Sequence, residues 1–201
     1  MGINAPFGSK KEYKLVPAGN HVARVYSIIH LGVIEEEYMG ETKEMDKVRI
    51  SFELPNETEV FKEGEEPKPF SISQEYTLSM GEKANLRKLV EGILGGPVEE
   101  QEEGFGVSSL MGKTCLLNVI HRTSKAGNEY AQIASAAPLP KGMEAPTAVN
   151  ETSYLDFEEG WDQEKFDSLP DFIKDKIKSS KNYKRKFNIP EEELDPSAIP
   201  F

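Results

Sequence analysis

Residues 46–54 alternate strictly between two kinds of side chain, and this pattern constrains the fold more than any other in the chain. One set of alternate positions is apolar and the other is polar or charged: Val48, Ile50, Phe52 and Leu54 against Lys47, Arg49, Ser51 and Glu53. Successive side chains of a β-strand point to opposite faces of the sheet, so the pattern predicts a strand with one buried face. The chain is therefore expected to build its core against one side of a sheet.

Four further segments have the composition of β-strands, residues 20–31, 70–78, 115–123 and 129–136. In the first of them, alternation predicts one core-like face made of Ala23, Val25, Ser27, Ile29 and Leu31. Residues 32–45 are charged and contain glycine, which predicts a long loop or ribbon tip. Pro55 is expected to end the 46–54 strand, and the charged, proline-containing residues 55–69 are expected to form a mobile loop.

Between the third and fourth strands the apolar spacing becomes helical. Residues 81–94 carry apolar side chains at intervals of three and four, and Gly95-Gly96-Pro97 then stops the helix. Residues 124–128 form a turn-rich cluster that predicts a hairpin between the last two strands. Three strands, a helix and a hairpin is the element order of the OB-fold, a five-stranded barrel that commonly binds oligonucleotides. The predicted fold class is mainly β (α+β), an OB-fold barrel with one inserted helix, although other small β-rich barrels share this order.

The remaining segments predict appendages to one barrel. We expect a flexible N-terminal arm at 1–13, the barrel at 14–147, a helical extension at 148–183 and a flexible acidic tail at 184–201. Residues 154–181 hold enough apolar side chains for one or two helices packed on the barrel. A basic cluster, Lys181, Lys184, Arg185 and Lys186, precedes the acidic run of the tail.

Composition narrows the possible functions. The net charge is −11 at pH 7, and residues 1–150 and 151–201 both contribute to it, which argues against a broadly basic nucleic-acid surface. Single-strand binders tolerate an acidic total where a local groove is cationic and aromatic rings stack on the bases. Cys115 is the only cysteine and is expected to be buried, and three scattered histidines lack metal-ligand spacing, so no metal or cofactor is predicted. No apolar run is long enough for a membrane span, and we expect a cytoplasmic protein with no membrane partner.

Cations and aromatic residues on the predicted strands and loops are the candidate nucleic-acid contacts. Lys47 and Arg49 project from the polar face of one strand, with a spacing that can follow a phosphate backbone. The hairpin adds two cations and an aromatic ring around its turn. The full candidate set is Arg24, Tyr26, Tyr38, Lys43, Lys47, Arg49, Phe70, Tyr76, Arg122, Lys125 and Tyr130. For the strand aromatics, packing in the core or rim is the alternative, and for Lys47 and Arg49 it is a solvated sheet face.

No catalytic residue is predicted. The glycines at 92, 95 and 96 follow a helix and lack the Gly-Lys-Ser/Thr ending of a phosphate loop. The acidic runs at 35–37, 63–66, 99–103 and 156–162 could supply carboxylate ligands for Mg²⁺, but they lie in predicted loops where solvated charge is ordinary.

The last residues combine acidic side chains with an apolar tip, Asp195-Pro196-Ser197-Ala198-Ile199-Pro200-Phe201. This ending resembles the C-terminal tip of bacterial single-stranded DNA-binding proteins, although Pro196, Ser197 and Ala198 interrupt the acidic run of that family. The resemblance implies that Asp195, Ile199, Pro200 and Phe201 bind replication and repair proteins. In the body of the chain the resemblance extends only to the order of the elements.

The sequence thus predicts a protein that is not an enzyme, and that binds and protects single-stranded DNA during replication, recombination or repair. A divergent body with such a tip would suit a phage-encoded protein in the host cytoplasm, and the resemblance is compatible with a homo-oligomer. Two alternatives stay open at this point. One is a Mg²⁺-dependent nuclease or recombination enzyme, and the other is a protein adaptor that imitates DNA.

Overall fold

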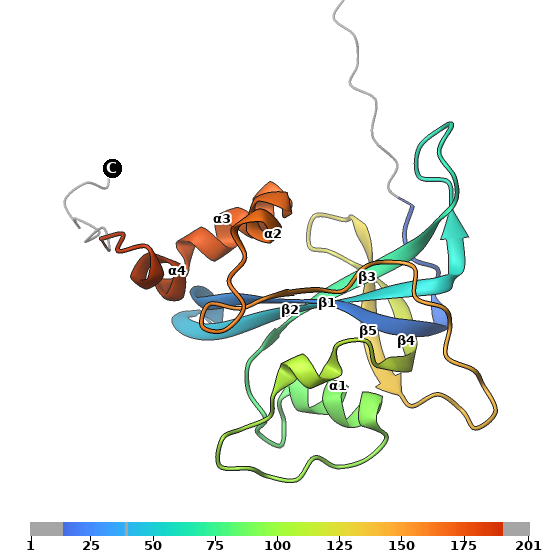
Figure 1. The fold of residues 1–201 in the computed structure, drawn as a ribbon, viewed down its shortest axis with the longest axis horizontal. Coiled ribbons are helices and arrows are strands. Elements are labelled where there is room, and N and C mark those ends of the chain that lie inside the picture. Colours follow the sequence, from blue (N-terminus) through green and yellow to red (C-terminus); the bar gives the residue numbers. More distant parts are fainter. Residues whose placement is uncertain (1–13, 39, 191–201) are drawn as a thin grey trace, which may run out of the picture.

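A computed structural model describes residues 14–38 and 40–190. Five long strands and one helix form the body, and three short helices follow a sixth strand (Figure 1). The elements are β1 (Gly19–Tyr38), β2 (Glu41–Glu59), β3 (Lys68–Thr77), α1 (Asn85–Leu94), β4 (Thr114–Thr123), β5 (Glu129–Ala137), β6 (Ser153–Leu155), α2 (Gln163–Ser168), α3 (Asp171–Ser179) and α4 (Lys181–Lys186), with a 3-10 turn at Val107–Leu110. Among the described residues, no helix is long and apolar enough to cross a membrane.

The strands form a mainly antiparallel sheet in the order β3-β2-β1-β4-β5, and β6 adds to β1 in parallel. The prediction of a mainly β fold with a few helices is confirmed. The sheet is open in the described residues, because β3 and β5 remain edge strands without backbone pairing. One side-chain hydrogen bond joins these edges, from the amide N of Ile133 to Oε1 of Gln74 at 3.2 Å.

Strands β1 and β2 are much longer than predicted. Their antiparallel pairing continues to Tyr38 and Glu41, so residues 32–38 and 41–45 form a two-stranded ribbon, which is the second of the two forms predicted for this segment. Charged side chains such as Glu36 and Lys43 occupy much of this ribbon, so no apolar alternation marks it in the sequence. The prediction that Pro55 ends the strand was wrong. Pro55 lies in a register shift between Leu54 and Thr58. The strand can pass through proline there, because its lack of an N–H costs no hydrogen bond of the ladder.

A bulge in β1 divides its apolar side chains between two cores. The register with β2 shifts between Val25 and Ser27, and the extra residue reverses which face the following side chains occupy. Ala23 and Val25 therefore belong to the main core, whereas Ile29 and Leu31 belong to a second cluster. The predicted single face running from Ala23 to Leu31 was wrong for this reason.

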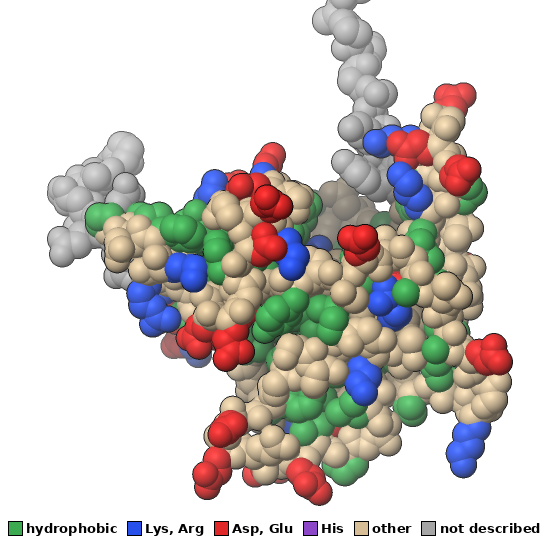
Figure 2. Space-filling model, viewed as in Figure 1, with side chains coloured by type: hydrophobic (Ala, Val, Ile, Leu, Met, Phe, Trp, Pro, Cys, Tyr) green, Lys and Arg blue, Asp and Glu red, His purple; other side chains and the backbone are tan. Residues whose placement is uncertain are grey.

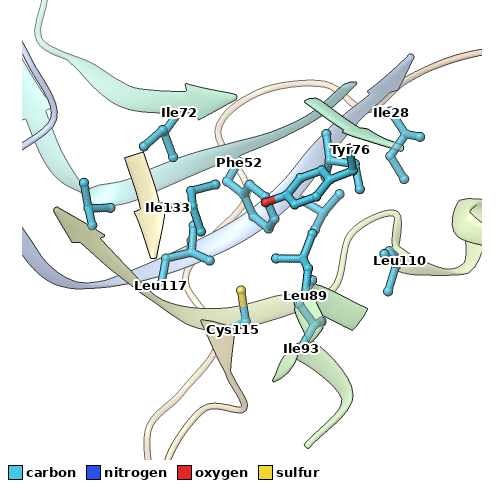
Figure 3. Packing of buried hydrophobic residues seen from close by; sticks show 14 of the residues in the cluster. Ile28, Phe52, Ile72, Tyr76, Leu89, Ile93, Leu110, Cys115, Leu117 and Ile133 are labelled. Atoms are coloured by element: carbon cyan, nitrogen blue, oxygen red, sulfur yellow. The ribbon is translucent and has the colours of Figure 1, made fainter. Parts of the chain in front are cut away.

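The main core lies between the sheet and α1. Figure 3 shows Phe52, Leu117 and Ile133 from the strands meeting Leu89 and Ile93 from the helix. Cys115 lies in the same cluster and is fully buried, as predicted. Burial raises the pKa of its thiol to about 12, so the thiolate is scarce at neutral pH.

Gly92 sets how closely α1 approaches β5. A Cβ atom at this position would lie 2.4 Å from the carbonyl oxygen of Ala136, which belongs to the backbone of β5 and cannot move aside. Helix propensity alone predicts that Gly92→Ala stabilises α1 by about 1 kcal/mol. We expect the opposite, a loss of about 1–3 kcal/mol of unfolding free energy, because the helix must shift off the sheet. Urea denaturation checks the sign, and a more stable variant would show that α1 does not pack this closely.

The C-terminal segment packs on the side of the β1–β2 ribbon opposite α1 (Figure 1). The second cluster holds it there, with Ile29 and Leu31 from β1 against side chains of the segment: Leu155, Phe157, Phe166, Ile173 and Ile177, with Trp161, Leu169 and Tyr183 partly buried around them. Asn182 adds a polar anchor, since its Oδ1 accepts a hydrogen bond from the amide N of Val33 at 2.9 Å. Three short helices thus replace the one or two that were predicted, and α4 runs past the expected boundary at residue 183.

A buried ion pair fastens the start of this segment to the sheet. Glu53 is fully buried, and its carboxylate accepts hydrogen bonds from Nε of Arg24 at 2.5 Å and from the backbone N and side-chain Nδ2 of Asn150, both at 2.7 Å. Arg24 in turn donates from Nη2 to the Asn150 carbonyl oxygen at 2.6 Å. The two opposite charges are thus paired, and both groups form hydrogen bonds. A buried charge is tolerated under these conditions.

His30 joins the ribbon to the C-terminal segment. Its Nε2 lies 2.7 Å from Oδ1 of Asp46 on β2, and its Nδ1 lies 3.1 Å from Oδ2 of Asp156, which follows β6. Burial alone would lower the pKa of His30, but the hydrogen bonds and charges of the two aspartates outweigh it and raise the pKa above 6.5. The pKa of Asp156 is lowered, since backbone N–H groups and His30 together outweigh its burial.

This arrangement predicts pH-dependent stability. The protonated His30 is stabilising below its unfolded pKa of about 6.5, and the contribution disappears as pH rises through the higher pKa of the folded state. At the acid end it disappears as pH falls through the lowered pKa of Asp156. The difference in unfolding free energy between wild type and His30→Gln should therefore be largest near pH 5–6 and shrink above pH 7. Equal pH profiles for the two proteins in urea titrations would contradict it.

Candidate nucleic-acid interface

The β4–β5 hairpin presents two cations and an aromatic ring to solvent. Arg122 and Tyr130 are cross-strand partners in the antiparallel register, so their side chains lie on the same face. Lys125 lies in the turn between the strands, and Tyr130 is 43% exposed. No carboxylate of the described chain pairs with Arg122 or Lys125, which leaves both charges available to an anion.

The turn of the hairpin is tightly hydrogen-bonded. The amide N of Ser124 donates to the Asn128 carbonyl oxygen at 2.8 Å, and the amide N of Gly127 donates to the Ser124 carbonyl oxygen at 2.9 Å. Gly127 has a φ of 82°, which a residue with a side chain adopts only with strain. The turn therefore holds Lys125 in place between the two strands.

A groove of about 370 Å³ opens beside the hairpin, where the edges of β3 and β5 approach each other. It brings Arg122 and Lys88 of α1 together with the amide side chains of Gln74 and Gln132. Hereafter this is the seam groove, lined by Gln74, Tyr76, Asn85, Lys88, Leu89, Ile120, Arg122 and 132–136. Amide and guanidinium groups can hydrogen-bond base edges and phosphates, so the groove has suitable chemistry for a nucleotide.

The cations predicted on β1 and β2 do not form an open stripe. Lys47 pairs with Glu36 at 2.6 Å, and Arg49 lies 3.5 Å from Glu75 and 5.6 Å from the ring centre of Phe172. Helix α3 covers this face, and its Lys176 also reaches Glu75, at 2.6 Å. Arg24 is buried in its pair with Glu53. With this packing, Lys47 and Arg49 lie neither on an open, DNA-facing stripe, as predicted, nor on a fully solvated sheet face, which was the alternative.

Two of the predicted aromatic contacts lie in the core. Tyr76 is 4% exposed and Phe70 is 8% exposed, and burial raises the pKa of the Tyr76 phenol. Figure 3 shows Tyr76 beside Phe52 within the main core. Neither ring is free to stack on a base as it is placed here. Tyr26 is partly buried at the β1 bulge, and Phe61, in the loop after β2, packs edge-on against Phe70.

The remaining predicted residues lie elsewhere. Tyr38 is the last residue of β1, and Lys43 lies on the ribbon, where its Nζ is 3.1 Å from a carboxylate oxygen of Glu41. The predicted partner-binding residues lie outside the described part of the chain: Asp195, Ile199, Pro200 and Phe201.

Sequence reasoning missed Lys88, Gln74 and Gln132. Gln74 was assigned to a strand and Lys88 lies within the helical segment, but no local pattern indicates that the two face one groove. Within residues 14–38 and 40–190, no group of three or more His, Cys, Asp or Glu side chains is placed to hold a metal ion. No protein-family model matches the chain, and no curated protein matches it in sequence.

Proposed function

We propose that this protein binds single-stranded DNA through the β4–β5 hairpin and the adjoining seam groove. The observation that carries the proposal is the set of Arg122, Lys125 and Tyr130, which are exposed on one hairpin and not paired with acidic residues of the described chain. An aromatic face stacks on any base, and the flanking cations neutralise phosphates, so this set suits binding without sequence preference.

The strand order supports an OB-fold as the scaffold. The order β3-β2-β1-β4-β5, with α1 between β3 and β4, is that of a five-stranded barrel cut between β3 and β5. The hydrogen bond between Gln74 and Ile133 crosses this cut. In an OB-fold the loop between the fourth and fifth strands closes over the ligand, and here that loop is the hairpin turn at 124–128.

The charge distribution supports a local site. Figure 2 shows acidic and basic side chains interspersed over the face that it presents, as expected from the many ion pairs of the chain. Many cations of the described chain are neutralised by ion pairs, so a site for an anionic ligand must come from cations that are unpaired and close together, as Arg122 and Lys125 are on the hairpin. We propose further that residues 191–201 recruit replication or repair proteins in the cytoplasm through the acidic, apolar-tipped segment.

Anisotropy of a fluorescein-labelled oligo(dT) of about 30 nucleotides tests the proposal, since one OB-fold occupies roughly 4–16 nucleotides. We expect saturable binding that weakens with salt, and much weaker binding of the matched duplex. Absence of binding at low salt would overturn the proposal, and cleavage of the oligonucleotide in Mg²⁺ would favour a nuclease. The label is needed because Trp161 packs in the second cluster against Phe157 and Phe166, away from the hairpin.

A further inference from the structure

Helix α4 concentrates positive charge in a chain that is otherwise acidic. Its sequence, Lys-Asn-Tyr-Lys-Arg-Lys, holds four cations and no acidic residue. Lys181 pairs with Glu44 of the ribbon. Lys184 and Arg185 have no ion pair with any carboxylate of the described chain, in contrast to Lys47, Arg49 and Lys176. Within the described part of the chain, these two adjacent positive charges are therefore left uncompensated.

The other side chains of α4 hold the helix in place. Asn182 accepts a hydrogen bond from the backbone of β1, and Tyr183 packs against Phe166 and Phe187. Lys186 donates from Nζ to the Phe157 carbonyl oxygen at 2.9 Å and lies over the Trp161 ring. The helix is thus fixed to the body on one side, while the side chains of Lys184 and Arg185 make no comparable hydrogen bond or ring contact with residues 14–38 or 40–190. A fixed cation pair loses less conformational freedom on binding than one on a mobile segment.

Lys184 and Arg185 line a groove of about 520 Å³ between α4 and the ribbon. Its other lining residues are Val33, Glu44, Lys181, Asn182 and Ile189. This α4 groove contains three cations, one carboxylate, one amide and two aliphatic side chains, and it has no aromatic ring. The carboxylate, Glu44, pairs with Lys181, so Lys184 and Arg185 give the groove its net positive charge. A phosphodiester backbone needs mainly cations to bind, and the adjacent Lys184 and Arg185 supply two of them.

We infer that the α4 groove binds the phosphate backbone of single-stranded nucleic acid, as a second contact outside the hairpin. The inference rests on the proposed function and extends it to the C-terminal segment. The C-terminal end of a helix carries a partial charge of about −0.5, which is smaller in magnitude than the two full positive charges of Lys184 and Arg185. The groove therefore remains attractive to an anion even though both cations lie in the last turn of α4.

The test compares wild type with Lys184→Ala/Arg185→Ala in the labelled oligo(dT) assay over a salt series. Each phosphate contact on a single strand contributes about 0.7 to the slope of log K against log salt, so losing two contacts should reduce the slope by about 1.4. The same relation predicts binding that is about tenfold weaker near 0.2 M salt, and a larger difference at lower salt. Both residues are partly or fully exposed, so the thermal midpoint should not change.

The matched control is Lys113→Ala/Lys141→Ala, which removes two exposed cations outside both grooves and should leave the slope unchanged. A wild type that binds with the same slope as the α4 variant would overturn the inference and leave the proposed function standing. A wild type that does not bind oligo(dT) at all would overturn both. If the α4 variant instead lost binding of a labelled poly-glutamate peptide while its DNA slope stayed the same, the groove would be a peptide site and the inference would be wrong.

Discussion

Replacing Arg122, Lys125 and Tyr130 with alanine together should weaken oligo(dT) binding by about 100-fold or more near 0.2 M salt. Stacking of a base on an aromatic ring contributes about 1–3 kcal/mol, and the loss of two phosphate contacts adds about a factor of ten at this salt concentration. Fluorescence anisotropy of the labelled oligonucleotide measures the change. The three side chains are exposed and lie on or beside one turn, so the fold should persist in the variant.

The single substitutions separate the two contributions. Tyr130→Ala should reduce affinity by a similar factor at all salt concentrations, whereas Arg122→Ala should also lower the salt slope, by about 0.7. The matched control is Lys113→Ala/Lys141→Ala/Phe172→Ala, which removes the same kinds of exposed side chain elsewhere. If the control and the hairpin variant lost affinity equally, binding would depend on total charge and not on the hairpin.

Glu53→Ala should lower the free energy of unfolding by about 3–5 kcal/mol, the largest stability change that we expect from a single polar substitution. The substitution leaves the guanidinium of Arg24 buried without its partner and removes the acceptor for three donors of residues 149 and 150. In a chain of this size the thermal midpoint should fall by roughly 10 °C. Glu63→Ala, at an exposed position, is the control and should stay within about 0.5 kcal/mol of wild type.

A double variant separates two contributions to the stability lost in Glu53→Ala: the loss of the ion pair, and the cost of leaving the Arg24 guanidinium buried without a partner. Arg24→Leu/Glu53→Leu removes both charges and should recover the part of the lost stability that comes from the unpaired guanidinium, since apolar replacement of a buried pair is often nearly neutral. The donors of residues 149 and 150 lose their acceptor in both variants, so that part of the loss should remain. If the double variant were less stable than Glu53→Ala, the ion pair itself would be the stabilising element.

The same pair predicts a dependence on pH. Burial alone would raise the pKa of Glu53, but hydrogen bonds from Asn150, Arg24 and Val149 outweigh it and hold the pKa below 4.5. The carboxylate therefore stabilises the fold above pH 4.5, and the contribution is lost as pH falls through the lower pKa of the folded state. The stability difference between wild type and Glu53→Gln should shrink over that acid range in urea titrations.

Local periodicity was a good guide wherever an element has one buried face. The β2 residues from Val48 to Leu54 are alternately buried and partly exposed over the first half of that stretch, and α1 presents Leu86, Leu89, Val90 and Ile93 to the core. The hairpin at 124–128 also lies where turn composition placed it. In these segments burial follows directly from the 2-residue or 3.6-residue repeat, so the sequence contains the information.

Periodicity failed where pairing, and not burial, defines the strand. The ribbon is held by cross-strand hydrogen bonds and by ion pairs such as Lys47 with Glu36, which produce no apolar pattern. A bulge leaves no pattern in the sequence either. One inserted residue moves Ile29 and Leu31 to the other face of the sheet, although the residue types in the strand give no sign of it. The site was affected in the same way. The turn composition placed Arg122, Lys125 and Tyr130 on a hairpin, but the neutralisation of Arg24, Lys47 and Arg49 depends on carboxylates that the fold brings to them from other segments.

The sequence by itself determined the mainly β class, the position of the helix between the third and fourth strands, the burial of Cys115 and the hairpin that carries exposed cations. Only the tertiary structure decided which cations remain available to a ligand, because that depends on whether Glu36, Glu53 or Glu75 lies within a few ångströms of each one. It also decided that the C-terminal helices cover the β1–β2 ribbon, since the bulge in β1 turns Ile29 and Leu31 toward them. Short-range repeats can be recognised directly in the sequence. Which charged groups form ion pairs, and which faces of the elements pack together, is determined only when the chain folds.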